Sequence, residues 1–181
     1  MKNLANTYYI SDLHLGHANV IRLCNRPFAS VEEMDEGLIT AWNKKVHKND
    51  TVYILGDLIY KSALDPQEYL QLLKGKKHLI LGNHDKSWAQ KVDLTKYFES
   101  VSSLAEINTG KGTAILCHYP LMDHRAKYHI HGHLHANVGQ PFWGLISGDE
   151  RMLNAGVDVN GYQPVSLEEL IENNAVFKSL H

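Results

Sequence analysis

The sequence predicts an α/β fold in which β-sheets are covered by helices. Short β-branched or aromatic runs alternate with amphipathic stretches along the chain, which is the pattern of sheets flanked by helices. Several apolar runs also lead directly into acidic, amide or histidine residues, as in YYISDLH, VYILGD, LILGNHD and AILCHYP. Because ligands collect at the carboxyl ends of strands in open α/β sheets, we expect the fold to bring these polar residues together.

The individual elements follow from local composition. Seven runs predict strands, over residues 8–11, 51–56, 78–81, 101–107, 113–117, 128–131 and 152–159. Four amphipathic stretches predict helices, over residues 18–24, 31–46, 66–73 and 167–173. Ser30 with Glu33, and Ser166 with Glu169, form capping-box patterns, and Pro66 suits a first helical turn.

Length and charge limit the class of protein. A chain of 181 residues with 44% hydrophobic residues suits one domain, over residues 1–181, with a continuous core. The formal net charge of −2 provides no general basic field, so we expect no duplex nucleic acid as a partner. A short nucleotide substrate remains compatible with this charge. No feature of the sequence specifies an oligomeric state.

The cysteines and the apolar runs predict a cytoplasmic protein. Cys24 and Cys117 form no CxxC pair, which argues against a disulfide framework and a thiolate zinc site. No stretch approaches the length of a membrane span, and the first residues lack the apolar run of a signal peptide. We therefore expect no contact with a membrane.

The residues at the predicted strand ends suggest a metal site. They supply carboxylate, imidazole and amide groups without thiolate, a set that suits manganese, iron, zinc, nickel or cobalt better than calcium or magnesium. They are too many for one ion, so their number suggests two metals that share a bridging carboxylate. The candidates are Asp12, His14, Asp57, Asn83, His84, Asp85, His118, His133 and His135.

The order of these residues resembles a known family. The strings D-x-H, G-D, G-N-H-D, a single H and G-H-x-H follow one another over roughly residues 8–135, as in calcineurin-like metallophosphoesterases. The segment LNAGVDVNGYQPVSLEEL resembles the closing strand and helix of small bacterial and phage members. The resemblance implies a four-layer αββα sandwich, with two mixed β-sheets flanked by helices and a dinuclear site at the strand ends.

The resemblance also implies a role for each motif residue. His84 would contact the leaving-group or a phosphate oxygen and act as general acid, with Asp85 orienting its imidazole. Asp57 would bridge two divalent ions, with manganese the first choice and iron, zinc, nickel or cobalt the alternatives. The first ion would be bound by Asp12, His14, Asp57 and His135, and the second by Asp57, Asn83, His118 and His133.

The implied activity is hydrolysis of a phosphate ester by a hydroxide held between the two ions. We expect a small nucleotide-like phosphodiester or cyclic phosphate as substrate, because the chain has little material beyond the catalytic core. A phosphomonoesterase or a nuclease on the same site is the alternative. A non-catalytic binding scaffold is a weaker one, because every motif position is filled by the expected residue type.

Five further side chains are candidates for contact with the substrate: His17, Arg22, Arg26, His124 and Arg125. For His17, capping of the following helix is an equal alternative, and for the arginines a solvated surface position is more common. Strand alternation predicts that His131 points away from His133 and has its hydrogen bonds satisfied. Cys24 is expected to pack in the core.

Overall fold

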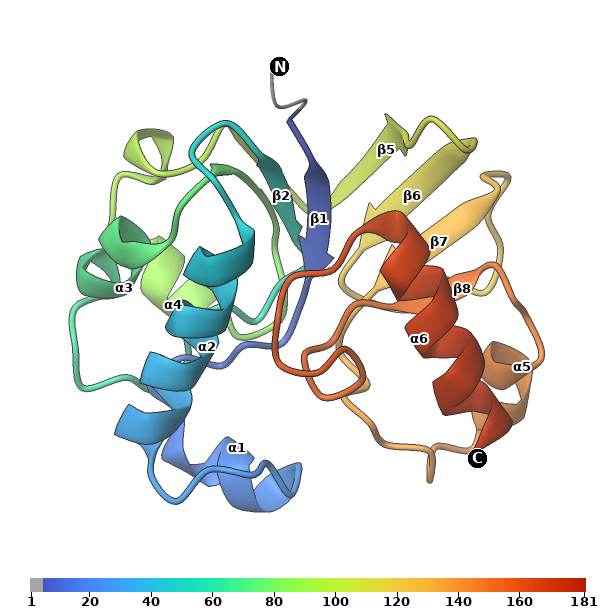
Figure 1. The fold of residues 1–181 in the computed structure, drawn as a ribbon, viewed down its shortest axis with the longest axis horizontal. Coiled ribbons are helices and arrows are strands. Elements are labelled where there is room, and N and C mark those ends of the chain that lie inside the picture. Colours follow the sequence, from blue (N-terminus) through green and yellow to red (C-terminus); the bar gives the residue numbers. More distant parts are fainter. Residues whose placement is uncertain (1–4) are drawn as a thin grey trace.

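The computed structural model of the protein describes residues 5–181 and contains two four-stranded sheets packed between helices (Figure 1). Helices α1 to α4 lie on one side of the sheets, and α5 and α6 lie on the other. This arrangement confirms the predicted α/β fold of two sheets flanked by helices. The helices are α1 Ala18–Leu23, α2 Val31–Lys45, α3 Pro66–Leu72, α4 Lys86–Ala89, α5 Trp143–Ser147 and α6 Leu167–Ser179, with one 3-10 turn, Leu94–Lys96.

The first sheet is parallel throughout, and only the second is mixed. The first has the order β1-β2-β3-β4, and the second has the order β5-β6-β7-β8 with β5 antiparallel to β6. The expectation of two mixed sheets is therefore correct for the second sheet alone. The strands are β1 Thr7–Ile10, β2 Thr51–Ile54, β3 Lys76–Ile80, β4 Ser100–Ser102, β5 Leu104–Asn108, β6 Thr113–Cys117, β7 Tyr128–His131 and β8 Met152–Asn154.

Strand β1 is buried on both faces because it separates two cores. Tyr8 and Ile10 pack toward α2 and α3, in a core that includes the fully buried Trp42. Tyr9 points the opposite way and packs between the sheets, as the two-residue period of a strand requires. A parallel strand covered on both sides reads as a continuous apolar run, which explains the sequence TYYI.

Five predicted strands have different bounds in the structure, and two of them differ most. The run over residues 101–107 is divided at Ser103 between β4 and β5, which belong to different sheets. The run over residues 152–159 ends as a strand at Asn154, because the Asn154 side chain accepts a hydrogen bond from the Gly156 N–H and turns the chain. The chain then crosses to the first sheet, where Gly156 forms an isolated bridge with Ser11.

The helices also differ in detail from the prediction. Helix α6 continues to Ser179, six residues beyond the predicted end, and α4 and α5 are too short to produce a periodic pattern. Ser166 and Glu169 form the complete predicted capping box. Ser30 caps α2 through the Glu33 N–H, but the Glu33 carboxylate bonds to the Ala29 N–H instead of the Ser30 N–H. Within residues 5–181, no helix is long and apolar enough to cross a membrane.

Candidate metal centre

The carboxyl ends of five strands meet around the carboxylate of Asp57, which follows β2. Asp57 Oδ2 lies 3.6 Å from His14 Nε2 and 3.6 Å from His118 Nε2. These two imidazoles come from opposite sheets, because His14 follows β1 and His118 follows β6. The structure thus brings the candidate ligands together, with one carboxylate oxygen between two groups of them.

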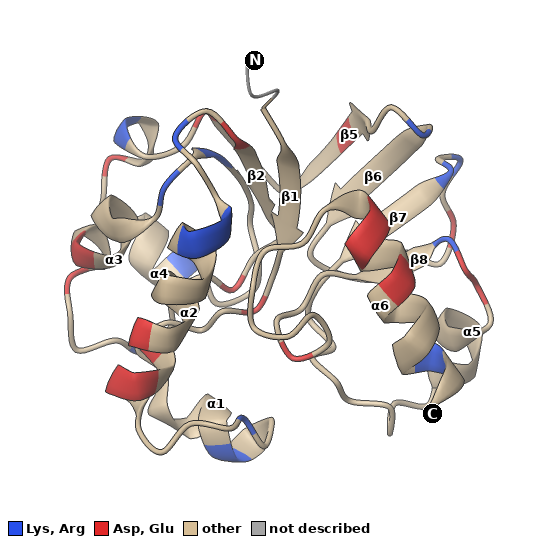
Figure 2. Ribbon diagram, in the orientation of Figure 1, with Lys and Arg blue, Asp and Glu red and all other residues tan. Residues whose placement is uncertain are grey.

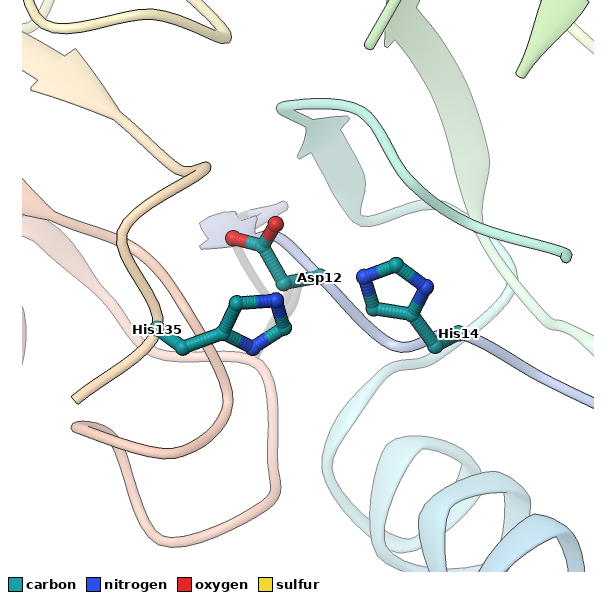
Figure 3. A group of neighbouring side chains, drawn as sticks. All are labelled: Asp12, His14 and His135. Atoms are coloured by element: carbon teal, nitrogen blue, oxygen red, sulfur yellow. The ribbon is translucent and has the colours of Figure 1, made fainter. Parts of the chain in front are cut away.

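The first group consists of Asp12, His14 and His135, whose ligand atoms lie within 4.8 Å of one another (Figure 3). His14 is 3% exposed, and neither of its ring nitrogens has a hydrogen-bond partner within residues 5–181. Burial, followed by the charge of His135, lowers the pKa of His14 to about 2, so the ring is neutral and carries a free lone pair. Because unpaired buried polar atoms are costly, a divalent ion fits this group of donors.

The second group consists of Asn83, His118 and His133. Asn83 Oδ1 lies 3.0 Å from both His118 Nε2 and His133 Nδ1. His118 Nδ1 donates to the Leu55 carbonyl at 2.7 Å, so in a neutral His118 ring Nε2 carries a lone pair. That lone pair faces the Asn83 oxygen, so two hydrogen-bond acceptors lie against each other without a proton between them. A cation bound by both acceptors would remove this repulsion.

The backbone at five candidate ligands is left-handed, a conformation that side chains other than glycine seldom adopt. Residues held in this conformation cluster at functional sites, where the surrounding structure enforces them. The left-handed backbone is an observation separate from the side-chain chemistry, and it occurs at residues already identified as candidate metal ligands. They are Asp12, His14, Asp57, His133 and His135, with φ of 57°, 53°, 54°, 72° and 51°.

Two glycines allow the ligand loops to approach one another. A Cβ at Gly82 would collide with the Asp57 carboxylate, and a Cβ at Gly132 would collide with the Ser11 hydroxyl. Each glycine precedes a candidate ligand, so its missing side chain makes room for a loop from another strand.

Asp85 does not orient the His84 imidazole, which corrects the expectation from the sequence. Its fully buried carboxylate accepts four hydrogen bonds at 2.8–2.9 Å, from the N–H groups of Asp57, Leu58 and Gly82 and from the Trp88 indole. These bonds fasten the loop after β2 to the loop after β3. Asp85 is therefore a structural residue of the centre.

His84 lies at the open side of the centre. Its side chain is 33% exposed, and Nε2 is 3.9 Å from Asp57 Oδ2. The ring packs on Tyr60 with 3.9 Å between centroids, and Tyr60 also contacts the His17 ring at 4.8 Å. Sequence reasoning missed Tyr60, although an aromatic residue three positions after Asp57 was a signal that could have identified it.

His17 faces the centre and does not cap α1. It precedes α1 and makes no side-chain capping bond. Its ring instead lies 5.6 Å from the His14 ring. The capping alternative is therefore wrong, and contact of His17 with substrate stays a prediction.

Arg26 is buried and serves the structure of the loop after β1. Its guanidinium donates to both oxygens of Asp158, at 2.8 and 3.0 Å, and to the carbonyls of Asp12 and Leu13. The predicted role in substrate contact is therefore wrong, because every direction of the guanidinium fork is taken by the protein.

Asp158 is a residue of the centre that the sequence analysis did not identify. It follows β8, and Oδ2 lies 2.7 Å from His135 Nδ1, which donates to it. The other nitrogen of His135 is thereby left for the first group of ligands, an arrangement common behind metal-bound histidines. An acidic residue after the last strand was the available signal.

The remaining predicted contacts have different outcomes. His124 is buried, with Nδ1 on the Ala126 carbonyl and its ring against His129, so the expected position facing the substrate is wrong. Arg22 and Arg125 are exposed, and their contact with substrate stays a prediction.

His131 differs from expectation, whereas Cys24 packs against the core as predicted. His131 bonds to the Gly132 carbonyl through Nδ1, but its buried Nε2 has no partner, so the ring is not fully satisfied. Cys24 packs at the edge of the core, and its sulfur lies within 4.8 Å of the ligand atoms of His135 and Asp158.

Known proteins are similar to this chain over most of its length. The profile of the calcineurin-like phosphoesterase family matches residues 6–119. An uncharacterised protein of Methanocaldococcus jannaschii is 37% identical and covers 99% of this chain and 98% of its own length. The gene 66 protein of Mycobacterium phage L5 is 33% identical, over 81% of this chain and 92% of its own. A crystal structure of a protein of unknown function from Aquifex aeolicus has a TM-score of 0.73 at 28% identity, covering 93% of this chain and 99% of that chain.

Substitution of Asp85 by asparagine tests its structural role. The NH₂ group of the asparagine would face N–H donors that now bond to a carboxylate oxygen, so some of these hydrogen bonds would be lost. We therefore expect the free energy of unfolding to fall by about 2–4 kcal/mol. Urea denaturation of the metal-free protein measures the change. An unchanged midpoint, with only activity lost, would contradict the structural role and restore the orientation of His84.

Substitution of Asp158 by asparagine tests the support of His135. We expect the affinity for a metal ion held by the group with His135 to fall by about 10–100-fold, because the imidazole loses its charged partner. Competition with a chromophoric chelator measures both affinities. Equal loss at both ions, or none, would argue against a specific role of Asp158 behind His135.

Metal binding should release a proton from His135. Burial lowers the pKa of this imidazole, but the hydrogen bonds with Asp158 and Cys24 and the charge of Asp12 outweigh burial and raise it to about 10. The metal-free ring is thus protonated near neutral pH, whereas a ligand must be neutral, so affinity should rise about tenfold per pH unit below the raised pKa. Calorimetry in two buffers of different ionisation enthalpy measures the release, and a value near zero would refute it.

Proposed function

This chain belongs to the calcineurin-like phosphoesterase family, and from that premise we propose that it hydrolyses a small phosphodiester or cyclic phosphate with a nucleotide-like organic group. It is a metallophosphoesterase with a buried group of aspartate and histidine side chains suited to metal ions. The ligand sets, the choice of metal and the substrate are parts of the proposal. We also assign the enzyme to the cytoplasm, in line with its two free cysteines.

The observation that carries the proposal is the position of Asp57 Oδ2 between two imidazole nitrogens at 3.6 Å each. Neither distance is a hydrogen bond, and both suit ligands that share an ion. We assign Asp12, His14, Asp57 and His135 to one ion and Asp57, Asn83, His118 and His133 to a second, with manganese preferred. Two such ions would lower the pKa of a bound water and would stabilise charge on phosphoryl oxygens.

The protein's own groups have separate tasks in this proposal. Asp12 and Asp57 would contribute two negative charges beside the four positive charges of two divalent ions. The site would therefore keep a net positive charge that attracts an anionic ester. His84, on the open side, donates a proton to the departing oxygen. The Tyr60 ring packs on His84 at 3.9 Å and limits the orientations of its imidazole.

The surface supports a small substrate over a duplex nucleic acid. Figure 2 shows Lys and Arg scattered over separate elements, with acidic residues on α2, α3 and α6. A protein that tracks a nucleic-acid backbone gathers its positive charge in one stripe or patch. The preference for a diester over a monoester is a finer part of the proposal, and the same site chemistry would serve a monoester.

A purely structural scaffold is a poor alternative because of His14. Its two ring nitrogens are buried without hydrogen-bond partners among the described residues. Without a bound ion, this burial destabilises the folded protein and no interaction compensates for it. The left-handed backbone at the candidate ligands adds to that cost.

Hydrolysis of bis-(p-nitrophenyl) phosphate and p-nitrophenyl phosphate tests the proposal. Metal-stripped protein should be inactive and should regain turnover with added manganese. Asp57→Asn should abolish restored turnover because it removes the shared carboxylate, whereas His84→Ala should lower kcat by about 10²–10⁴-fold.

The ratio of the two substrates decides between diester and monoester. Leu145→Ser, at an exposed residue of α5 outside the candidate ligand sets, serves as the control variant and should keep wild-type rates. Two bound ions without turnover of either ester would refute hydrolysis of simple phosphate esters.

A further inference from the structure

An apolar groove of about 700 Å³ lies beside the candidate metal centre and has no role in the function proposed above. Its walls come from the end of β3, from α4, from the 3-10 turn, from the junction of β4 and β5 and from the end of β6. The residues that form its apolar surface are Leu81, Ala89, Leu94, Leu104, Cys117 and Tyr119.

The groove and the metal centre share a wall. Gly82 lines the groove and directly precedes Asn83, and its Cα is so close to the His118 ring that a Cβ would lie 3.0 Å from it. On the other side, the Tyr119 ring centroid is 4.9 Å from that of His133 and 5.2 Å from that of His118. An ester bound at the centre therefore has the groove within reach of its organic group.

Two exposed candidate ligands lie next to residues that line this groove. Asn83 and His133 are exposed, whereas Asp12, His14 and His118 are buried. Asn83 adjoins Gly82 and His133 packs against Tyr119, so this exposed pair borders the groove.

The lining selects for an apolar ring. Leu104 is 50% exposed and Tyr119 is 45% exposed, so both have apolar surface to offer a ligand. Polar side chains, Lys86 among them, stand at the rim, and a volume near 700 Å³ is in the range of small-molecule sites. The exposed Tyr119 ring suits offset or edge contact with another aromatic ring.

We propose that this groove binds the organic group of the substrate, a planar aromatic ring carried on the phosphate ester. This inference rests on the proposed function and gives it a substrate class. A second groove of about 710 Å³ between α2 and α3 is lined by four carboxylates, from Glu32, Asp35, Glu36 and Glu68, which repel an anionic ester.

Binding of phosphonates to the manganese-loaded protein tests the groove without turnover. Phenylphosphonate should bind about tenfold more tightly than methylphosphonate, because the ring buries apolar surface that the methyl group does not. Leu104→Ser should reduce this preference to about threefold. The matched control is Leu72→Ser on α3, which is 53% exposed and lines the other groove, and it should keep the wild-type ratio.

Titration calorimetry measures both affinities in each variant. Ser103→Trp, which would fill the groove from its rim, is a second variant and should remove the preference. Equal binding of the two phosphonates by the wild type, no binding of either, or an equal loss in Leu72→Ser would overturn the inference.

Hydrolysis of p-nitrophenyl phenyl phosphate and p-nitrophenyl methyl phosphate separates this inference from the proposed function. The two esters share a leaving group, so a higher kcat/KM for the phenyl ester reports binding of the second organic group. Turnover of both esters at equal kcat/KM, with equal phosphonate binding, would contradict ring binding in the groove and would still support phosphoesterase activity. Preferential binding of phenylphosphonate without turnover of either ester would support ring binding in the groove and would contradict the proposed hydrolysis.

Discussion

The structure depends on holding five candidate ligands in a left-handed backbone conformation at the ends of strands. Each such residue costs of order 1–3 kcal/mol, in a protein whose net stability is expected to be about 5–15 kcal/mol. Buried hydrogen bonds hold the loops in place. Asp85 fastens the loop after β2, and Arg26 fastens the loop after β1 through the carbonyls of Asp12 and Leu13. Much of the backbone strain thus lies in the loops that direct the candidate ligands toward one another.

The C-terminal part of the chain completes this support from the second sheet. The Asn154 side chain donates to the His135 carbonyl, and the Asn174 side chain in α6 bonds to both backbone groups of Asn154. Asp158, on the turn that follows, holds the His135 ring. Helix α6 is therefore linked through one asparagine to a candidate ligand, and the closing segment helps to position the centre as well as to cover the sheet.

Protons and metal ions compete for the same groups. In the metal-free chain, the raised pKa of His135 places a proton between two carboxylates, while the lowered pKa of His14 leaves that ring neutral. Two neighbouring imidazoles thus differ in charge, because burial lowers the pKa of His14 whereas hydrogen bonds with Asp158 and Cys24 outweigh burial at His135. Binding of a divalent ion would replace the proton and give His14 its missing partner. Part of the free energy of metal binding would therefore appear as stability of the fold.

The sequence by itself determined the α/β class, most strand positions and the residues that gather at the centre. It could do so because β-branched runs and the polar residues after them are local signals. Only the tertiary structure decided how these residues are supported. Arg26 meets Asp158 across 132 positions of sequence, and Asp85 bonds to backbone groups of another loop. The composition of the strand-forming run over residues 101–107 does not indicate that its two halves belong to different sheets. The division at Ser103 therefore could not be predicted from the sequence. Such partners depend on distances between elements that are remote in the chain, and local composition does not encode them.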